Sequence, residues 1–125
     1  MIILNDNRFS DEIFEYVSTK EDIQNSSNNS TLIFDYKESD LDLYKFCNQN
    51  DIPYGVEISS IKELIYISNL GAKYAICDFE VAKNLQKIAD NYLIMTKIIV
   101  KSHISNIENI AQSEIDGIFV IKENK

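Results

Sequence analysis

The chain has 125 residues, of which 45% are hydrophobic, and a formal net charge of −8; this suits one globular domain with a single core. Arg8 is the only arginine, so the chain lacks the basic patch that nucleic acid or an anionic membrane surface requires, and we expect neither partner. No basic segment precedes an apolar run, and no stretch approaches the roughly 20 apolar residues of a membrane span. These features predict a cytoplasmic protein, with Cys47 and Cys77 as free thiols.

The first thirty residues differ from the rest of the chain. Residues 2–4 predict a short strand, and residues 11–18 predict a helix that begins after Ser10. Three apolar residues share one face of that helix: Ile13, Phe14 and Val17. Residues 24–30 contain no apolar side chain and predict a flexible polar linker. Residues 1–23 would then form an extension joined by this linker to a core over residues 31–125.

From residue 31 onward, predicted strands and helices alternate with a period of about 20 residues, which is typical of βαβ units in a parallel sheet. The strands are expected at 31–35, 54–58, 73–78, 97–100 and 118–121. A closed eight-stranded barrel needs about 200 residues or more. We therefore expect a flavodoxin-like α/β fold: an open, doubly wound parallel sheet of five strands, with helices on both faces. The segment at residues 2–4 can add a sixth strand at the edge.

Several common sites are excluded by composition. The three glycines lie too far apart for a Walker loop or a G-x-G-x-x-G turn, which excludes a nucleotide cradle of the usual kind. His103 is the only histidine, so a histidine-rich metal site is excluded too.

Polar side chains stand where the predicted strands end. Parallel strands end at one edge of a sheet, so these residues are expected around one shallow site: Asp35, Glu57, Asp78, Ser102 and Lys122. Two carboxylates, Asp35 and Asp78, suit Mg²⁺, which prefers oxygen ligands. The lysine and the serine hydroxyl suit a phosphoryl group.

The same residues resemble a response-regulator receiver domain over about residues 31–123. The strand that ends at Asp35 is similar to that family's first strand. Asp78, in the context Ile-Cys-Asp-Phe, resembles the phospho-accepting aspartate. Ile98 to Ser102 resembles the fourth strand with its hydroxyl residue, and the strand before Lys122 resembles the last one.

The resemblance implies a signalling module that takes a phosphoryl group on Asp78 with Mg²⁺ in place, and Phe119 as the switch aromatic. Tyr36 stands where the family has a second acidic residue, and the final helix is absent. A degenerate receiver that binds a protein partner without phosphorylation is therefore one form of this hypothesis. A plain structural alternative is that Asp78 only caps the following helix.

Two further hypotheses stay open. The last strand has no helix after it, so its exposed face favours a non-catalytic interaction protein that dimerises or binds a partner there. Separately, Gly55-Val56-Glu57 with the following helix is similar to the repeating unit of class I aldolase barrels. In those barrels the next strand carries a Schiff-base lysine, where this chain has Ile76. That resemblance implies a small aldolase- or lyase-like enzyme, with Lys101 as the substitute amine beside Glu57 and Asp78.

Overall fold

The computed structural model describes residues 1–122. Its elements follow one another as β1 (Ile2–Leu4), β2 (Ile13–Tyr16), α1 (Lys20–Gln24), β3 (Ser30–Asp35), η1 (Glu38–Asp40), α2 (Leu41–Gln49), β4 (Tyr54–Glu57), α3 (Ile61–Asn69), β5 (Tyr74–Cys77), α4 (Phe79–Asn91), β6 (Lys97–Ser102), η2 (Ile104–Asn106), α5 (Ile107–Gln112) and β7 (Gly117–Val120). The end of the predicted core and of the receiver-like range, residues 123–125, lies outside the described residues.

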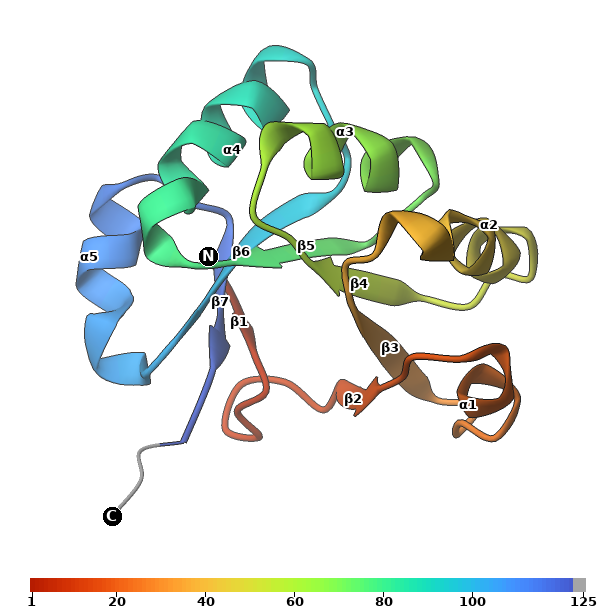
Figure 1. Ribbon diagram of the computed structural model, residues 1–125. Helices are drawn as coiled ribbons and strands as arrows, with labels where there is room; N and C mark the ends of the chain where they lie inside the picture. The colour runs from red at the N-terminus through yellow and green to blue at the C-terminus, as the bar shows by residue number, and fades with distance from the viewer. Residues whose placement is uncertain (123–125) are drawn as a thin grey trace.

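The seven strands form one sheet in the order β1-β7-β6-β5-β4-β3-β2, and every neighbouring pair is parallel. From β2 to β7 each strand lies beside the next one in the sequence. The chain therefore winds in one direction only, and the sheet curls into a half-barrel with helices α2 to α5 along its outer side (Figure 1). The α/β class and the parallel sheet are confirmed. The five-stranded, doubly wound, flavodoxin-like arrangement is wrong, because its strand order would reverse in the middle of the sheet.

Two separate apolar clusters explain the one-sided arrangement. The larger cluster joins the outward-facing residues of the strands, such as Phe34 and Val56, to the buried faces of the helices, such as Leu64 and Leu85. The smaller cluster fills the concave inner side and contains residues of β1, β2, β3, β5, β6 and β7 but none from a helix. Its buried members are Leu4, Ile33, Tyr74, Ile76, Ile99 and Phe119. A sheet that curls over its own side chains needs no helix layer on that face.

The curl brings the two ends of the sheet close together. Phe14 of β2 packs edge-on against Phe119 of β7, with ring centres 5.1 Å apart, although β2 and β7 are far apart in the strand order. The segment between β1 and β2 runs along a side where Figure 1 shows no helix. The sheet thus closes over a small apolar interior through side-chain contacts rather than through an eighth strand.

Residues 11–18 are not a helix, and this prediction is wrong. Residues Ile13–Tyr16 form strand β2, which pairs with β3. The spacing of Ile13, Phe14 and Val17 also suits a helix face, but Phe14 and Tyr16 alternate toward the inner side as strand residues do. Tertiary contacts with the inner cluster decide the outcome.

The polar tract at residues 24–30 ends α1 at Gln24, turns over residues 25–29 and begins β3 at Ser30. The carboxylate of Glu15 accepts hydrogen bonds from the backbone N–H of Ser27 and the hydroxyl of Ser30, at 3.0 and 2.9 Å. On the other side of α1, Thr19 and Asp22 form a capping box. The first strands are therefore built into the same sheet as the rest of the chain.

Four successive helices, α2 to α5, end in the same way. The residue after each C-cap has a positive φ: Asp51, Gly71, Leu93 and Glu114. In α2, α3 and α4 the next N–H also bonds back to the last turn, as in Ile94 N–H to the Ala89 carbonyl at 2.8 Å. This is the Schellman pattern, in which glycine is usual at the left-handed position. The core is therefore a repeated βα unit with one common connection.

The last strand, β7, is covered. β1 pairs with it in the sheet, its outward residues Ile118 and Val120 are buried in the outer cluster, and α5 packs on it. No helix within residues 1–122 is long and apolar enough to cross a membrane.

Candidate functional site

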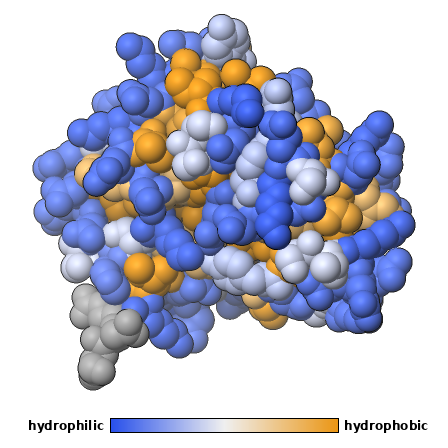
Figure 2. Space-filling model, in the orientation of Figure 1, coloured by the Kyte–Doolittle hydropathy of each residue, from blue (hydrophilic) through white to orange (hydrophobic). Residues whose placement is uncertain are grey.

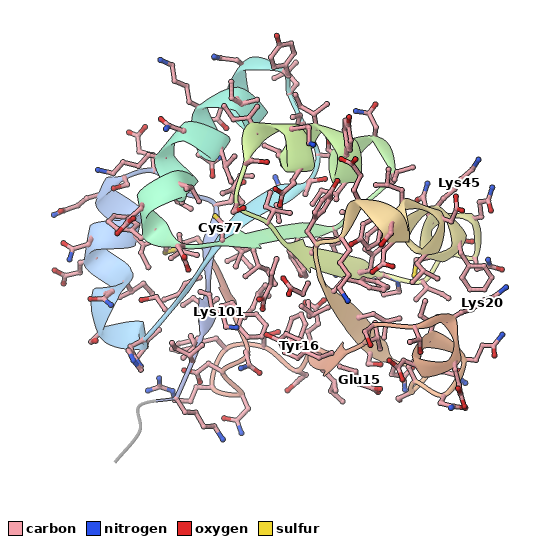
Figure 3. The ribbon with its side chains drawn as sticks, viewed as in Figure 1. Glu15, Tyr16, Lys20, Lys45, Cys77 and Lys101 are labelled. Atoms are coloured by element: carbon pink, nitrogen blue, oxygen red, sulfur yellow. The ribbon has the colours of Figure 1, made fainter. Side chains whose placement is uncertain are left out.

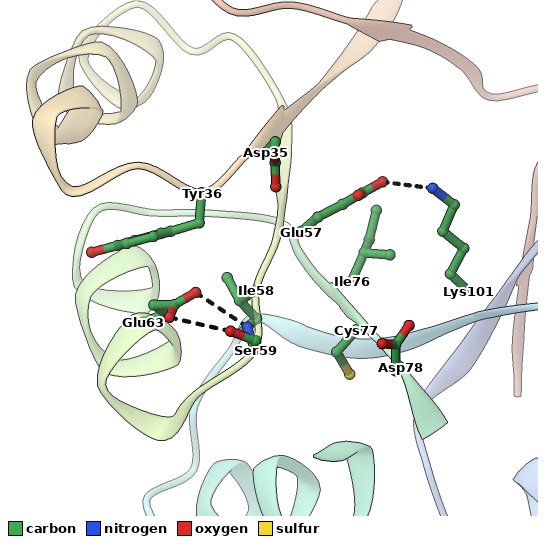
Figure 4. A pocket seen from close by; sticks show the side chains of 10 residues that line it. All are labelled: Asp35, Tyr36, Glu57, Ile58, Ser59, Glu63, Ile76, Cys77, Asp78 and Lys101. Atoms are coloured by element: carbon green, nitrogen blue, oxygen red, sulfur yellow. Dashed lines mark hydrogen bonds and ion pairs between the residues drawn. The ribbon is translucent and has the colours of Figure 1, made fainter. Parts of the chain in front are cut away.

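A hollow of about 340 Å³ opens at the end of the sheet where the strands terminate (Figure 4). We call it the mouth hollow. Its lining comes from the ends of β3, β4, β5 and β6, from the loops that follow β3, β4 and β5, and from the first turn of α3: Asp35, Tyr36, Glu57, Ile58, Ser59, Glu63, Ile76, Cys77, Asp78 and Lys101. In α/β barrels the carboxyl ends of the strands are where binding and catalytic groups gather.

The best-defined contact in the mouth hollow joins three strands. Glu57 of β4 accepts hydrogen bonds from Lys101 Nζ of β6 and from the Tyr16 hydroxyl of β2, both at 3.0 Å to the same oxygen, Oε2. Lys101 also lies 5.6 Å from the centre of the Tyr16 ring, on the inner side of the sheet (Figure 3). Partial desolvation lowers the pKa of Lys101, but the hydrogen bond and charge of Glu57 outweigh it and raise the pKa overall. Lys101 is therefore held as an ammonium ion.

The other carboxylates of the hollow differ in their partners. Glu63 accepts hydrogen bonds from the Ser59 N–H at 3.1 Å and the Ser60 hydroxyl at 2.9 Å, so it serves the start of α3. Asp35 and Asp78 are exposed, and within residues 1–122 neither side chain has a hydrogen-bond or salt-bridge partner. Asp78 stands at the N-cap of α4, yet its side chain makes no capping bond. Helix capping therefore does not account for Asp78.

The rest of the lining is apolar or unreactive. Ile58, Ile76 and Cys77 are buried, and burial raises the pKa of the Cys77 thiol to about 12, which leaves it protonated and a poor nucleophile. The Tyr36 ring forms one side of the hollow, and its hydroxyl, which is buried without a partner among the described residues, points away from Glu57 (Figure 4). The hollow thus combines charged groups with an apolar floor.

No protein-family model matches the sequence, and no curated protein is recognisably similar to it. The chemistry of the site must therefore be inferred from its own side chains.

The structure does not bring all the residues of the receiver-like hypothesis into one hollow. Asp35 and Asp78 share the mouth hollow. The Ser102 hydroxyl donates to the His103 carbonyl and accepts from the Asn106 side chain. Lys122 lines a different hollow, between the end of β7 and the loop after β1.

Phe119 is buried in the inner cluster against Phe14. Within residues 1–122, no three histidine, cysteine or carboxylate side chains converge as metal ligands. Asp35 and Asp78 are the residues that would hold the expected Mg²⁺, and that metal remains a prediction.

A second polar cluster lies at the opposite end of the interior, which the sequence analysis did not find. Glu12 accepts hydrogen bonds from the Thr31 hydroxyl at 2.6 Å, the Tyr74 hydroxyl at 2.7 Å and Lys73 Nζ at 3.1 Å. Burial alone would raise the pKa of Glu12. These hydrogen bonds and the charge of Lys73 lower the pKa by a larger amount, so the net shift is downward. Glu12 ties the start of β2 to β3 and to β5 across the interior.

Tyr16 and Glu12 were missed for one reason. Both belong to the segment that the sequence predicted as a helix, where neither would face the strand ends. The signal that finds them is the alternation of Glu12, Phe14 and Tyr16, which places all three side chains on one face of a strand.

Proposed function

We propose that the protein binds a small organic cation, such as a protonated amine, in the mouth hollow. The observation that carries the proposal is the pair Asp35 and Asp78, two carboxylates that face the hollow without partners in the described part of the chain. Because Glu57 already neutralises Lys101 and Glu63 serves α3, these two carboxylates are the groups left for a ligand.

Charge and lining favour an organic cation over other ligands. Four carboxylates and one ammonium line the hollow, a formal charge of −3, and the whole chain adds to this potential with its charge of −8. An anionic substrate would be repelled. Ile58, Ile76 and the Tyr36 ring offer contact to methylene groups, which a bare metal ion would not use. A volume of about 340 Å³ suits a small ligand.

The spacing of the two carboxylates favours a ligand with two positive groups. Asp35 ends β3, Asp78 follows β5, and β4 lies between them. Neighbouring strands are about 4.8 Å apart, and Asp78 lies two residues beyond Ile76, which is level with Asp35 across β4. The two backbone positions are therefore separated by roughly 12 Å. A linear diamine can place one ammonium group near each carboxylate, whereas a monoamine reaches only one of them.

The test is an NMR titration of ¹⁵N-labelled protein at low ionic strength with 1,4-diaminobutane, butylamine and inorganic phosphate. We expect saturable shifts around the mouth hollow with the diamine, weaker shifts with butylamine and none with phosphate. Asp35→Asn and Asp78→Asn should each weaken diamine binding about fivefold, the effect of losing one partly exposed ion pair. Glu108→Gln, an exposed change on α5 away from the hollow, is the control. Equal affinity in all four proteins, or shifts spread over the whole acidic surface, would refute the proposal.

Receiver-type signalling is a second candidate, favoured by the shared position of Asp35 and Asp78 in one hollow. Its other groups argue against it, since Lys122 lines a separate hollow and Ser102 is engaged with Asn106. Adding Mg²⁺ with beryllofluoride to the same sample separates the two candidates. Shifts that need both reagents and disappear in Asp78→Asn would favour the receiver. Unchanged spectra would eliminate it.

A further inference from the structure

We infer that two copies of this chain associate through an apolar surface on α3 and the loop after α4. This surface, the α3–α4 patch, consists of Ile61, Ile65, Tyr66, Tyr92, Leu93 and Met95, all of which are exposed. Tyr92, Leu93 and Met95 are 75%, 85% and 88% exposed. Apolar surface is visible at the top of Figure 2, where Figure 1 draws the end of α4 and the loop that follows it.

A groove runs through the middle of the patch. It lies between the ends of α3 and α4 and is lined by Ile65, Ser68, Asn69, Tyr92, Ile94 and Met95. None of these side chains is charged. In a chain with a net charge of −8, a groove without a carboxylate is unusual. Contiguous apolar surface of this kind marks interaction sites in soluble proteins.

The backbone at Leu93 gives an independent reason. Four helices end with a residue in the left-handed conformation, and three of these residues are suited to contact with water: Asp51, Gly71 and Glu114. The fourth is Leu93, with φ 54°. A leucine there loses free energy relative to glycine because its Cβ crowds the backbone. Because the Leu93 side chain is 85% exposed, its burial in a single copy of the chain offsets little of this free-energy cost.

A second copy is the occupant that fits the charges. The chain has 20 acidic and 12 basic residues, so two copies that meet through charged surface place like charges against each other. The groove of the α3–α4 patch avoids that repulsion. A two-fold axis needs only one self-complementary surface, so the patch of one copy can pack on the same patch of the other.

The exposed area is at the lower end of what a stable interface needs. A large, fully exposed side chain presents about 200 Å², so the six residues expose on the order of 700 Å². A standard interface buries about 600–1,000 Å² on each partner. The C-terminal end of α4 lies at the opposite end of the helix from Asp78. A dimer centred on the groove lies away from Asp78, and only Ile61, at the start of α3, comes close to Ser59 and Glu63 of the mouth hollow. The inference does not depend on the proposed function.

The test measures mass in solution over a concentration series from about micromolar to about millimolar, by sedimentation velocity and light scattering. We expect a reversible monomer–dimer equilibrium that added salt does not weaken, because the contact is apolar and salt screens the repulsion between two copies of charge −8. Leu93→Gly relieves the backbone conformation while it removes the side chain. We expect this change to weaken the dimer roughly tenfold or more without lowering the melting temperature of the monomer. Met95→Lys places a charge in the groove and should leave only monomer, with an unchanged circular dichroism spectrum.

The matched control is Glu114→Gly, the same backbone change at the equivalent position of α5, which should leave the equilibrium unaltered. Three results would overturn the inference. The first is a wild-type protein that stays monomeric at every concentration. The second is a dimer that survives both Leu93→Gly and Met95→Lys. The third is open-ended aggregation without a defined dimer.

Discussion

The two ends of the curved interior hold the same chemistry in different surroundings. At one end Glu12 accepts hydrogen bonds from Tyr74 and Lys73, and at the other Glu57 accepts them from Tyr16 and Lys101. The difference is in the tyrosines, because Tyr74 is 4% exposed and Tyr16 is 57% exposed. The Tyr74 hydroxyl cannot exchange its partner for water without a buried group being left unpaired, whereas the Tyr16 hydroxyl can.

The burial of its tyrosine partner therefore decides how much each carboxylate contributes to the fold. Strand β2 pairs only with β3, and its other edge has no strand beside it in residues 1–122. Glu12 and Phe14 therefore make the side-chain contacts that hold this strand over the interior. Glu57 sets the charge and position of Lys101 in an open hollow and contributes less to the fold. We interpret the Glu12 cluster as structural and the Glu57 cluster as adaptable.

The largest expected effect is that of removing Glu12. Glu12→Ala leaves the hydroxyls of Tyr74 and Thr31 buried without an acceptor, and each such group costs about 1–3 kcal/mol. We expect unfolding free energy to fall by about 3 kcal/mol, a large share of the 5–15 kcal/mol typical of a domain, measured by urea denaturation. Glu57→Ala, the matched change at the other end, should cost less than about 1 kcal/mol because its partners turn to water. Equal losses would contradict the comparison.

A smaller effect is expected from the two tyrosine hydroxyls. Tyr74→Phe removes one bond to a carboxylate in a buried site and should cost about 1.5 kcal/mol. Tyr16→Phe should cost less than about 0.5 kcal/mol because its hydroxyl is solvated when unpaired. The measurement is again urea denaturation, followed by circular dichroism. A larger loss for Tyr16→Phe would mean that the mouth, not the buried end, holds the sheet together.

The sequence predicted the repeated part of the fold much better than the N-terminal part. The five strands from β3 to β7 lie close to the positions predicted from the alternation of strand and helix patterns in the sequence. This alternation is visible in the sequence because each strand belongs to a local βα unit. The strand order is not local. Both a doubly wound sheet and a half-barrel repeat the same unit, and the choice depends on side chains from distant strands, such as Phe14 and Phe119.

The candidate site was predicted in part for the same reason. Asp35, Glu57 and Asp78 follow directly from strand ends, and they do line one hollow. Tyr16 could not be placed at this site, because residues 11–18 were predicted to form a helix instead of a strand of the sheet. Lys122 was expected at the same edge, but the curl of the sheet places it beside the loop after β1 instead. The position of such a residue depends on the direction in which the sheet bends, and that direction cannot be predicted from the sequence of any one strand or helix.

The pH dependence of stability should reveal Glu12. Its folded pKa is lower than the ordinary 4.5, so the unfolded chain binds its proton more readily. The carboxylate then contributes stability above the unfolded pKa, and this contribution is lost as pH falls through the folded pKa. The stability difference between wild type and Glu12→Gln should therefore shrink from about pH 6 to about pH 3. A difference that stays constant over this range would show that Glu12 is not held as a carboxylate.

The smallest effect concerns Lys101 and bears directly on the mouth. Desolvation lowers the pKa of Lys101, but Glu57 raises it by more, so Glu57→Gln should let the pKa fall below its wild-type value. A neutral amine is the form that attacks a carbonyl. Reductive methylation by formaldehyde and cyanoborohydride, read by mass spectrometry of peptides, should modify Lys101 slowly in wild type and faster in Glu57→Gln, with exposed Lys83 as the internal reference. The opposite result, faster modification of Lys101 in the wild type, would mean that Glu57 activates the amine instead of keeping it protonated. That result would support the aldolase-like hypothesis, against which the raised pKa of Lys101 argues.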